Sequence, residues 1–324
     1  MNEFNLIQQY FSGKSFPRKD VILGIGDDAA ITQVPENQCL VTTTDTLIED
    51  VHFLKGTSAA DIAYKTIAVN LSDLAAMGAE PAWLNLSLSM PSVDKLWLTE
   101  FSDMVAELCE YYSVQLIGGD TVKGQLSLTL TAQGFVPQES ILKRSGAQNG
   151  DWIYVTGTLG DAGAGLDILK GKLTINDKEA REYLVNRHLR PAPRVLAGTC
   201  LRRIASACID LSDGLLQDVA HISNTSDTGI LLQLDKLPIS PALGKNVDSL
   251  EKALEYATTS GDDYELLFTV PEEQKTSMQT TLDSYSIQYT CIGQVTGAAG
   301  KLDLLLNNQA YDLSSETRHG YQHF

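Results

Sequence analysis

The sequence predicts an α/β (α+β) protein of two domains. Segments in which apolar residues alternate, as they do in strands, recur along the whole chain with segments of helical spacing. At 324 residues, the chain is longer than a single hydrophobic core usually supports. The stretch 137–150 is polar and rich in turn residues, so we place the two domains at residues 1–137 and 138–324.

In the first half, two strands and one helix are predicted. Residues 38–44 and 126–136 are rich in Val, Leu and Thr, and the second segment alternates well enough for a half-buried strand. Between them, Ser58 and Asp61 resemble a capping box, and helical spacing continues from there until Gly78 and Pro81 stop it. The first half is therefore expected to combine a sheet with a long helix.

In the second half, strand and helix signals alternate again. Residues 151–169 are expected to form a strand, a glycine-rich loop and a helix. Residues 197–207 are predicted to be helical, and residues 230–234 and 265–270 to be strands.

Two features of this half are assigned no site. The glycines of 156–165 match no phosphate-binding fingerprint, and close packing of a strand against a helix explains them. The basic run from Arg187 to Arg194 is interpreted as a helix start that faces solvent or a dimer partner.

Composition excludes several classes of partner. The chain carries 24 Lys and Arg against 41 Asp and Glu, a formal charge of −17, which would repel nucleic acid and anionic membrane surfaces. Its start lacks the pattern of a signal peptide, and no apolar run approaches the roughly 20 residues of a membrane-spanning helix. We therefore expect a soluble, cytoplasmic protein whose scattered cysteines are buried, reduced thiols: Cys39, Cys109, Cys200, Cys208 and Cys291.

Aspartates dominate the candidate functional residues. A single Gly-Asp or Asp-Asp pair is common in turns and is weak evidence on its own. Asp45 and Asp120, however, each end an apolar run, where an α/β sheet presents its ligand-binding edge, and Asp73 lies in an otherwise apolar helix, where a carboxylate needs a cation. The six clusters are Gly26-Asp27-Asp28, Thr43-Thr44-Asp45, Ser72-Asp73, Gly118-Gly119-Asp120, Asp210-Leu211-Ser212-Asp213 and Gly261-Asp262-Asp263.

These oxygen-rich clusters favour a hard cation. Carboxylates supported by the hydroxyls of Thr43 and Thr44 suit Mg²⁺ or Mn²⁺, and calcium stays open although no EF-hand pattern is present. Several divalent ions would let a carboxylate-rich pocket accept the phosphates of a nucleotide. The chain has neither a Walker A sequence nor the motifs of protein kinases, so a less common ATP-binding fold is required.

Taken together in order and spacing, these motifs resemble the thiamine-monophosphate kinase family. They are GIGDDAA, TTDTLIEDVHF, NLSDLAAMGAEP, IGGDT, DLSDGL and GDDYELLF, and the resemblance extends from Phe4 to the terminal HGYQHF. It implies the two-domain fold of aminoimidazole ribonucleotide synthetase, with the N-terminal domain pairing across a homodimer and binding ATP and metal, and the C-terminal α/β domain completing the active site. It also implies direct, in-line transfer of the ATP γ-phosphoryl group to thiamine monophosphate, the final step of thiamine diphosphate biosynthesis.

The resemblance also implies roles for individual residues. Asp120 and Asp213 would be catalytic; Gly119, Asp120, Arg144 and Ser212 would contact the nucleotide; His52, Asp262 and Tyr321 would contact the substrate. Asp50 and Asp262 depart from relatives, which often carry Gly and Glu there. Several Mg²⁺ ions, whose number and whose need for a monovalent cation stay open, would be bound by Asp27, Asp28, Thr43, Thr44, Asp45, Asp73, Asp120, Asp210 and Asp213.

Two alternatives remain. The first is another ATP-dependent synthetase of the same superfamily, acting in aminoimidazole ribonucleotide, selenophosphate or hydrogenase-maturation chemistry. The reactive N-terminal Cys of selenophosphate synthetases and the C-terminal Cys of the hydrogenase factor are both missing here. The second alternative is an acidic protein that binds metal without catalysis.

Overall fold

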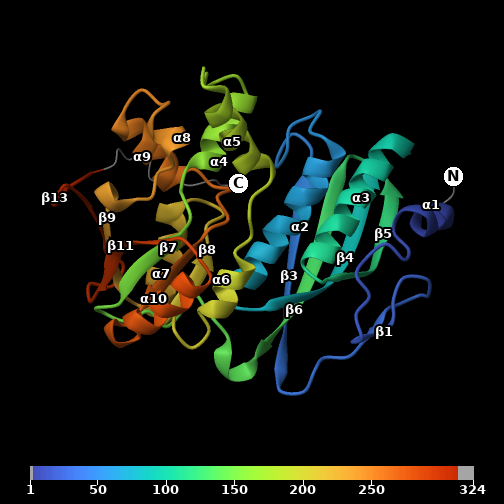
Figure 1. Cartoon of the computed structure of the whole chain (residues 1–324), viewed down its shortest axis with the longest axis horizontal. Coiled ribbons are helices and arrows are strands. Elements are labelled where there is room, and N and C mark those ends of the chain that lie inside the picture. Colours follow the sequence, from blue (N-terminus) through green and yellow to red (C-terminus); the bar gives the residue numbers. More distant parts are fainter. Residues whose placement is uncertain (1–2, 313–324) are drawn as a thin grey trace. The chain divides into compact units, whose positions relative to one another are not determined.

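The computed structural model describes residues 3–312, and the chain divides into two compact units (Figure 1). The first unit comprises Met1–Leu74 and Ala79–Glu139. The second unit comprises Ala75–Gly78 and Ser140–Phe324.

The first unit is built on a four-stranded sheet in the order β3-β6-β4-β5. The strands β3 and β4 run antiparallel to β6, and β4 runs parallel to β5. The elements are α1 (Glu3–Tyr10), β1 (Val21–Leu23), β2 (Ile31–Thr32), β3 (Gln38–Ile48), α2 (Ala59–Ala76), β4 (Glu80–Met90), α3 (Lys95–Tyr111), β5 (Gln115–Lys123), β6 (Ser127–Pro137) and the 3₁₀ turn η1 (Gln138–Ser140).

The alternation of residues in these strands separates an apolar face from a polar face. Helices α2 and α3 cover one face, on which Leu84, Leu128 and Leu130 are buried (Figure 1). On the opposite face the hydroxyls of Thr44 and Thr131 lie 2.8 Å apart, in a pair exposed to solvent. One side of the sheet thus forms the core of the unit. The other presents hydroxyls at Thr44 and Thr131, and elsewhere on it Trp83 and Phe135 are buried with Val21 and Ala30 packed against their cluster.

The predicted capping box begins α2. Ser58 Oγ accepts a hydrogen bond from the backbone N–H of Asp61 at 3.0 Å and donates one to the Asp61 carboxylate at 2.7 Å. The helix ends at Ala76, and Gly78 follows with a φ of +68°, a conformation that glycine adopts without strain. The helix expected between Ser58 and Gly78 is confirmed.

The second unit surrounds a seven-stranded sheet in the order β13-β12-β9-β11-β7-β10-β8, antiparallel except for β12 beside β9. Its core gathers apolar residues from the sheet and from α7 and α9. The elements are β7 (Trp152–Thr156), α4 (Asp161–Leu169), α5 (Lys178–Leu189), α6 (Val195–Cys200), β8 (Ala207–Asp210), α7 (Leu215–Ser226), β9 (Gly229–Gln233), η2 (Leu234–Lys236), α8 (Pro241–Gly244), α9 (Leu250–Thr259), β10 (Leu266–Val270), η3 (Glu272–Gln274), α10 (Lys275–Ser284), β11 (Tyr289–Thr296), β12 (Leu302–Leu306) and β13 (Gln309–Ala310).

The predicted elements of this half are confirmed with one exception. Strand β7, the glycine-rich loop and α4 follow one another as expected, and β9 and β10 lie within a residue of their predicted ranges. The helix predicted for 197–207 is wrong beyond Cys200, because Arg203 adopts a φ of +62° and Ala207 begins β8. The apolar run there is a buried strand paired with β10.

Across residues 3–312, no helix combines the length and apolar character that crossing a bilayer requires. All five cysteines are free thiols. Cys109 and Cys208 are buried as expected, whereas Cys39, Cys200 and Cys291 are only partly buried.

Candidate active site

A cavity of about 820 Å³ in the first unit collects several predicted site residues. Its apolar wall includes Phe11 of α1 together with Leu86 and Ile117 of the sheet. Its acidic and glycine-rich wall contains Asp27, Asp28, Gly119 and Asp120. The apolar wall suits a flat, apolar group. The acidic end attracts cations, through which it could accept phosphates attached to that group.

Local geometry explains the residue types in this wall. A Cβ on Gly119 would lie 1.9 Å from the carbonyl oxygen of Leu86, so only glycine allows β5 to approach β4 here. The Asp27 and Asp120 carboxylates each accept the N–H of the following residue, at 2.9 and 2.8 Å, and both side chains remain exposed. Both residues line the cavity.

A second group in this unit comprises Thr43, Asp45 and Asp73. Thr43 and Asp45 are two residues apart on β3 and so share one face of the strand, where Thr43 Oγ1 donates a hydrogen bond to Asp73 Oδ2 on α2. Burial, and secondarily the charge of Asp73, raise the pKa of Asp45 to about 6.

The residues of this second group fit a divalent cation. Two carboxylates forced together in a partly buried position repel each other, and a cation between them would reverse that repulsion. The donors are hydroxyl and carboxylate oxygens without sulfur or imidazole, the set that Mg²⁺ prefers.

The Asp45 group and the cavity residues around Asp120 lie on different strands of the sheet, a separation that the sequence did not predict. Asp45 and Asp120 lie within β3 and β5, so the expectation that each ends its strand is wrong. Register aligns Asp45 with Gly119 through Leu130 and Leu86, three interstrand spacings or about 14 Å apart. Thr44 lies on the polar face with Thr131, opposite to the face that carries Asp45.

The His52 side chain is held in one orientation. Its Nδ1 accepts the backbone N–H of Ile48 at 3.0 Å, so the neutral ring carries its proton on Nε2. The buried Lys65 reaches the carbonyl oxygen of His52 at 3.5 Å. His52 can therefore present an Nε2–H donor to an anionic group.

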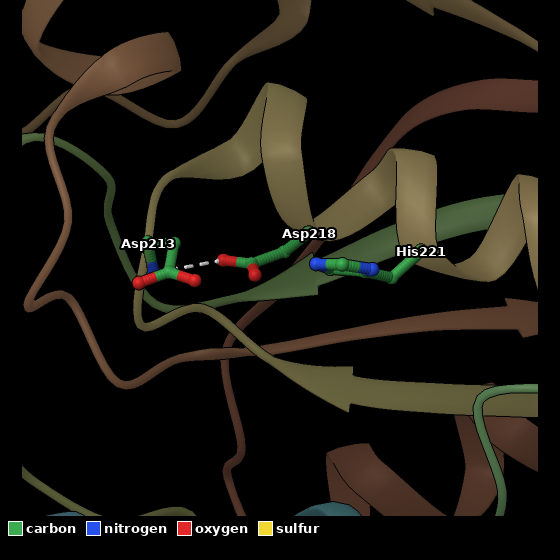
Figure 2. Close-up of side chains that lie close together, drawn as sticks. All are labelled: Asp213, Asp218 and His221. Carbon is green, nitrogen blue, oxygen red and sulfur yellow. Dashed lines mark hydrogen bonds between the residues drawn. The ribbon is translucent and has the colours of Figure 1, made fainter. Parts of the chain in front are cut away.

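In the second unit, Asp218 shapes the loop that carries Ser212 and Asp213. Its Oδ2 accepts the backbone N–H groups of Ser212, Asp213 and Gly214 at 3.1, 3.2 and 3.2 Å. Burial, and secondarily Asp213, raise the pKa of Asp218 to about 7. One ligand atom from each of Asp213, Asp218 and His221 lies within 4.8 Å of the others (Figure 2).

Asp218 and His221 were missed by the sequence analysis. The available signal was local, because both residues fall on one face of the helix that follows Asp213, three positions apart. Asp218 stands four residues after Gly214 inside α7, so no neighbouring glycine or acidic residue marks it in the sequence.

Backbone hydrogen bonds join this loop to the Gly261–Glu265 segment. The N–H of Asp262 donates to the Ser212 carbonyl at 2.9 Å, and a Cβ on Gly261 would lie 2.2 Å from that oxygen. The structure thus brings Ser212, Asp213 and Asp262 together.

The interpretation of the basic run as a solvent-facing or dimer-facing helix start is wrong. Arg187 and His188 stand at the end of α5, and the Arg187 side chain is 11% exposed. Arg187 and Arg194 both bind the fully buried carboxylate of Glu265, the first at 2.8 Å and the second through two hydrogen bonds. Two arginines of the run are thus ion-paired to one buried carboxylate.

Of the remaining predicted residues, Asp210 and Arg144 belong to the second unit. Asp210 is buried at the end of β8, opposite Leu266 of β10. Arg144 is exposed in the segment before β7. Tyr321 lies outside the described residues.

Comparison with known proteins agrees with this arrangement of motifs. Residues 26–136 match the N-terminal domain, and residues 148–303 the C-terminal domain, of AIR synthase related protein. The chain is 50% identical over 322 residues to thiamine-monophosphate kinase of Escherichia coli K12, covering 99% of this chain and 98% of that protein.

Solved structures give the same result. Thiamine-monophosphate kinase from Stenotrophomonas maltophilia K279a is 42% identical, with a TM-score of 0.86 over 94% of this chain and 97% of that one. A structure of AaThiL complexed with AMPPCP and TMP is 32% identical, with a TM-score of 0.77 over 93% of this chain and 92% of that one. The chain therefore belongs to the thiamine-monophosphate kinase family, within the AIR synthase related proteins.

Proposed function

We propose that this chain transfers the γ-phosphoryl group of ATP to thiamine monophosphate, giving thiamine diphosphate and ADP. The observation that carries this proposal is the full-length similarity to thiamine-monophosphate kinases, one of which has been solved with AMPPCP and TMP. The first unit adds a cavity whose apolar and acidic walls suit a metal-bound nucleotide. The product is thiamine diphosphate, so the reaction is the last step of its biosynthesis.

We further propose that several Mg²⁺ ions take part. When bound, they neutralise the charge of the transferring phosphoryl group. The chain contributes the oxygens that hold them, and the Asp45 and Asp73 pair is the best-supported part of this set. The full set consists of Asp27, Asp28, Thr43, Thr44, Asp45, Asp73, Asp120, Asp210 and Asp213.

The remaining residues bind and orient the two substrates. Gly119, Arg144 and Ser212 contact the nucleotide, and His52 offers Nε2–H to the phosphate of thiamine monophosphate. Asp262 and Tyr321 contact the cationic thiamine moiety. Catalysis then consists of holding the acceptor phosphate in line with the γ-phosphoryl group.

The proposed organisation assigns ATP binding, metal binding and dimerisation to residues 1–137. Residues 138–324 supply the remaining ligands. The exposed hydroxyls of Thr44 and Thr131 on one face of the β3-β6-β4-β5 sheet support homodimer formation, since they are accessible to a second copy. The five free thiols support a reducing, cytoplasmic setting.

The test is ADP production from ATP and Mg²⁺, with and without thiamine monophosphate, and chromatographic identification of the product. We expect strict dependence on thiamine monophosphate and formation of thiamine diphosphate. Turnover of formylglycinamidine ribonucleotide instead would identify a different member of the superfamily.

Replacing His52 by alanine is expected to raise the KM for thiamine monophosphate about tenfold, with a smaller change in the KM for ATP. The reason is the loss of an oriented Nε2–H donor on the acceptor side. Steady-state kinetics with each substrate varied in turn measures the two values. Equal rises in both would show that His52 does not belong to the acceptor site.

Replacing Asp218 by alanine is expected to lower kcat about tenfold to a hundredfold. Three backbone N–H groups would lose their common acceptor, and the positions of Ser212 and Asp213 would relax. Asp218→Asn, which keeps an oxygen acceptor, should lose less, and the exposed Asn224→Ala on the same helix should change nothing. A normal kcat in Asp218→Ala would argue against a role for this loop.

A further inference from the structure

The end of α5 packs against the segment that carries Asp262. Arg187 Nη2 donates to the Glu265 carboxylate at 2.8 Å and lies 3.4 Å from the Asp263 carbonyl oxygen. His188, which is 2% exposed, places Nδ1 3.5 Å from Asp262 Oδ2. Two successive side chains of one helix therefore hold this segment from the interior.

Asp262 has a second support on its other carboxylate oxygen. Tyr264 donates its hydroxyl to Asp262 Oδ1 at 3.2 Å. Tyr264 thus hydrogen-bonds one oxygen of the carboxylate, and His188 Nδ1 lies 3.5 Å from the other, an ion pair when the imidazole is protonated.

The backbone here is held in an uncommon conformation. Asp262 and Tyr264 have φ values of +68° and +50°, in the left-handed region that residues other than glycine adopt less readily. The N–H of Asp262 binds the Ser212 carbonyl at 2.9 Å, and that of Tyr264 binds the Leu211 carbonyl at 2.8 Å. Such strain persists where the surroundings impose it, and it gathers at ligand sites.

The other carboxylates of this cluster are occupied by the protein itself. Asp161 accepts hydrogen bonds from Thr158, Tyr183 and Ser240. Asp263 accepts the N–H of Gly160 at the start of α4, and Glu265 binds Arg187 and Arg194.

Exposure sets Asp262 apart within this cluster. The side chains of Asp161 and Glu265 are fully buried and Asp263 is 3% exposed, whereas the Asp262 side chain is 31% exposed. Although burial lowers the pKa of Arg187, the carboxylates of Glu265, Asp263 and Asp161 raise it overall, so its guanidinium stays charged. The Asp262 carboxylate is thus the accessible one of the four, and it lies beside the buried ion pair of Arg187 and Glu265.

We propose that His188 is a positioning residue for substrate recognition, which holds the Asp262 carboxylate toward the cationic part of the thiamine substrate. Arg187 supports this role by binding the Asp263 carbonyl oxygen and the Glu265 carboxylate, in the segment that follows Asp262. The proposal rests on the proposed function, since it concerns the acceptor of that reaction. A carboxylate fixed in advance binds a cation without the entropy cost of ordering it.

The test compares His188→Leu with His188→Asn in the full-length protein. His188→Leu removes the nitrogen beside Asp262, and we expect the KM for thiamine monophosphate to rise about tenfold while the KM for ATP and kcat stay within about twofold. His188→Asn keeps a side-chain N–H near the position of Nδ1 and should restore most of the loss. Arg181→Met, an exposed change on the same helix, should match the wild type.

A double-mutant cycle separates positioning from general destabilisation. If His188 acts through Asp262, Asp262→Asn and His188→Leu together should raise the KM no more than Asp262→Asn alone. Additive effects, or equal rises in the KM for both substrates, would overturn the proposal.

Tyr264→Phe keeps the cycle available if His188→Leu does not fold. It removes the other donor to Asp262 and should likewise raise the KM for thiamine monophosphate in a way that is not additive with Asp262→Asn. Additivity there would overturn the positioning of Asp262. Failure of the proposed function is a different result, because the wild type itself would then form no ADP in response to thiamine monophosphate.

Discussion

Replacing Asp73 by asparagine is expected to abolish turnover of thiamine monophosphate, a loss of at least about a thousandfold, while the fold stays intact. Asp73 accepts a hydrogen bond from Thr43 and lies close enough to Asp45 to raise the pKa of that carboxyl. Asparagine preserves the shape of the side chain but removes the negative charge that attracts a divalent cation. ADP formation under saturating ATP and thiamine monophosphate measures the loss.

The same variant should behave in opposite ways with and without metal. In EDTA its Tm should be no lower than that of the wild type, because removing one carboxylate relieves the repulsion between Asp45 and Asp73. In excess Mg²⁺ the wild type should gain stability, about 2.7 kcal/mol at a hundred times the Kd, and the variant should gain far less.

Asp103→Asn is the matched control, since this carboxylate of α3 is 63% exposed. It should keep both activity and the response to Mg²⁺. An Asp73→Asn enzyme with normal turnover, or one that is stabilised by Mg²⁺ as strongly as the wild type, would remove Asp73 from the metal site.

Local patterns in the sequence predicted most elements near the site. The capping box of α2 and the succession of β7, glycine-rich loop and α4 depend on residues close together in the chain. The strand predicted for 38–44 nevertheless extends to Ile48, because β3 pairs with β6 along its whole length. Asp45 therefore lies inside the strand, since pairing with a distant partner overrides the local end signal.

Residue roles were harder to predict where they depend on contacts distant in sequence. The burial of Arg187 follows from Glu265, 78 residues away, and a basic run alone gives no sign of that partner. Asp218 had a local signal in its position after Gly214, but its importance comes from the three N–H groups that converge on it. Asp73 was identified inside its helix, whereas Asp218, which lies in α7 without a neighbouring glycine or acidic residue, was not.

The other large effect is expected from Glu265. This carboxylate is fully buried, accepts the hydroxyl of Thr156 at 2.6 Å and binds both Arg187 and Arg194. Glu265→Gln keeps the size of the side chain but leaves two guanidinium groups without their common partner. Breaking a buried ion pair by removing one member typically costs about 3–5 kcal/mol, so we expect a loss of unfolding free energy in that range.

Hydrogen exchange at the backbone amides of β7 and β10 measures this loss within the second unit, without requiring the whole chain to unfold in one step. Glu273→Gln, an exposed change in η3, should alter exchange by no more than about 0.5 kcal/mol. If these amides are as well protected from exchange in the Glu265→Gln variant as in the Glu273→Gln variant, the ion-pair cluster around Glu265 does not stabilise the unit. If the loss appears, Glu265 stabilises the buried guanidinium groups and, through them, the second unit. The contribution of this cluster, against which the Asp262 segment packs, is then known from a measurement independent of catalysis.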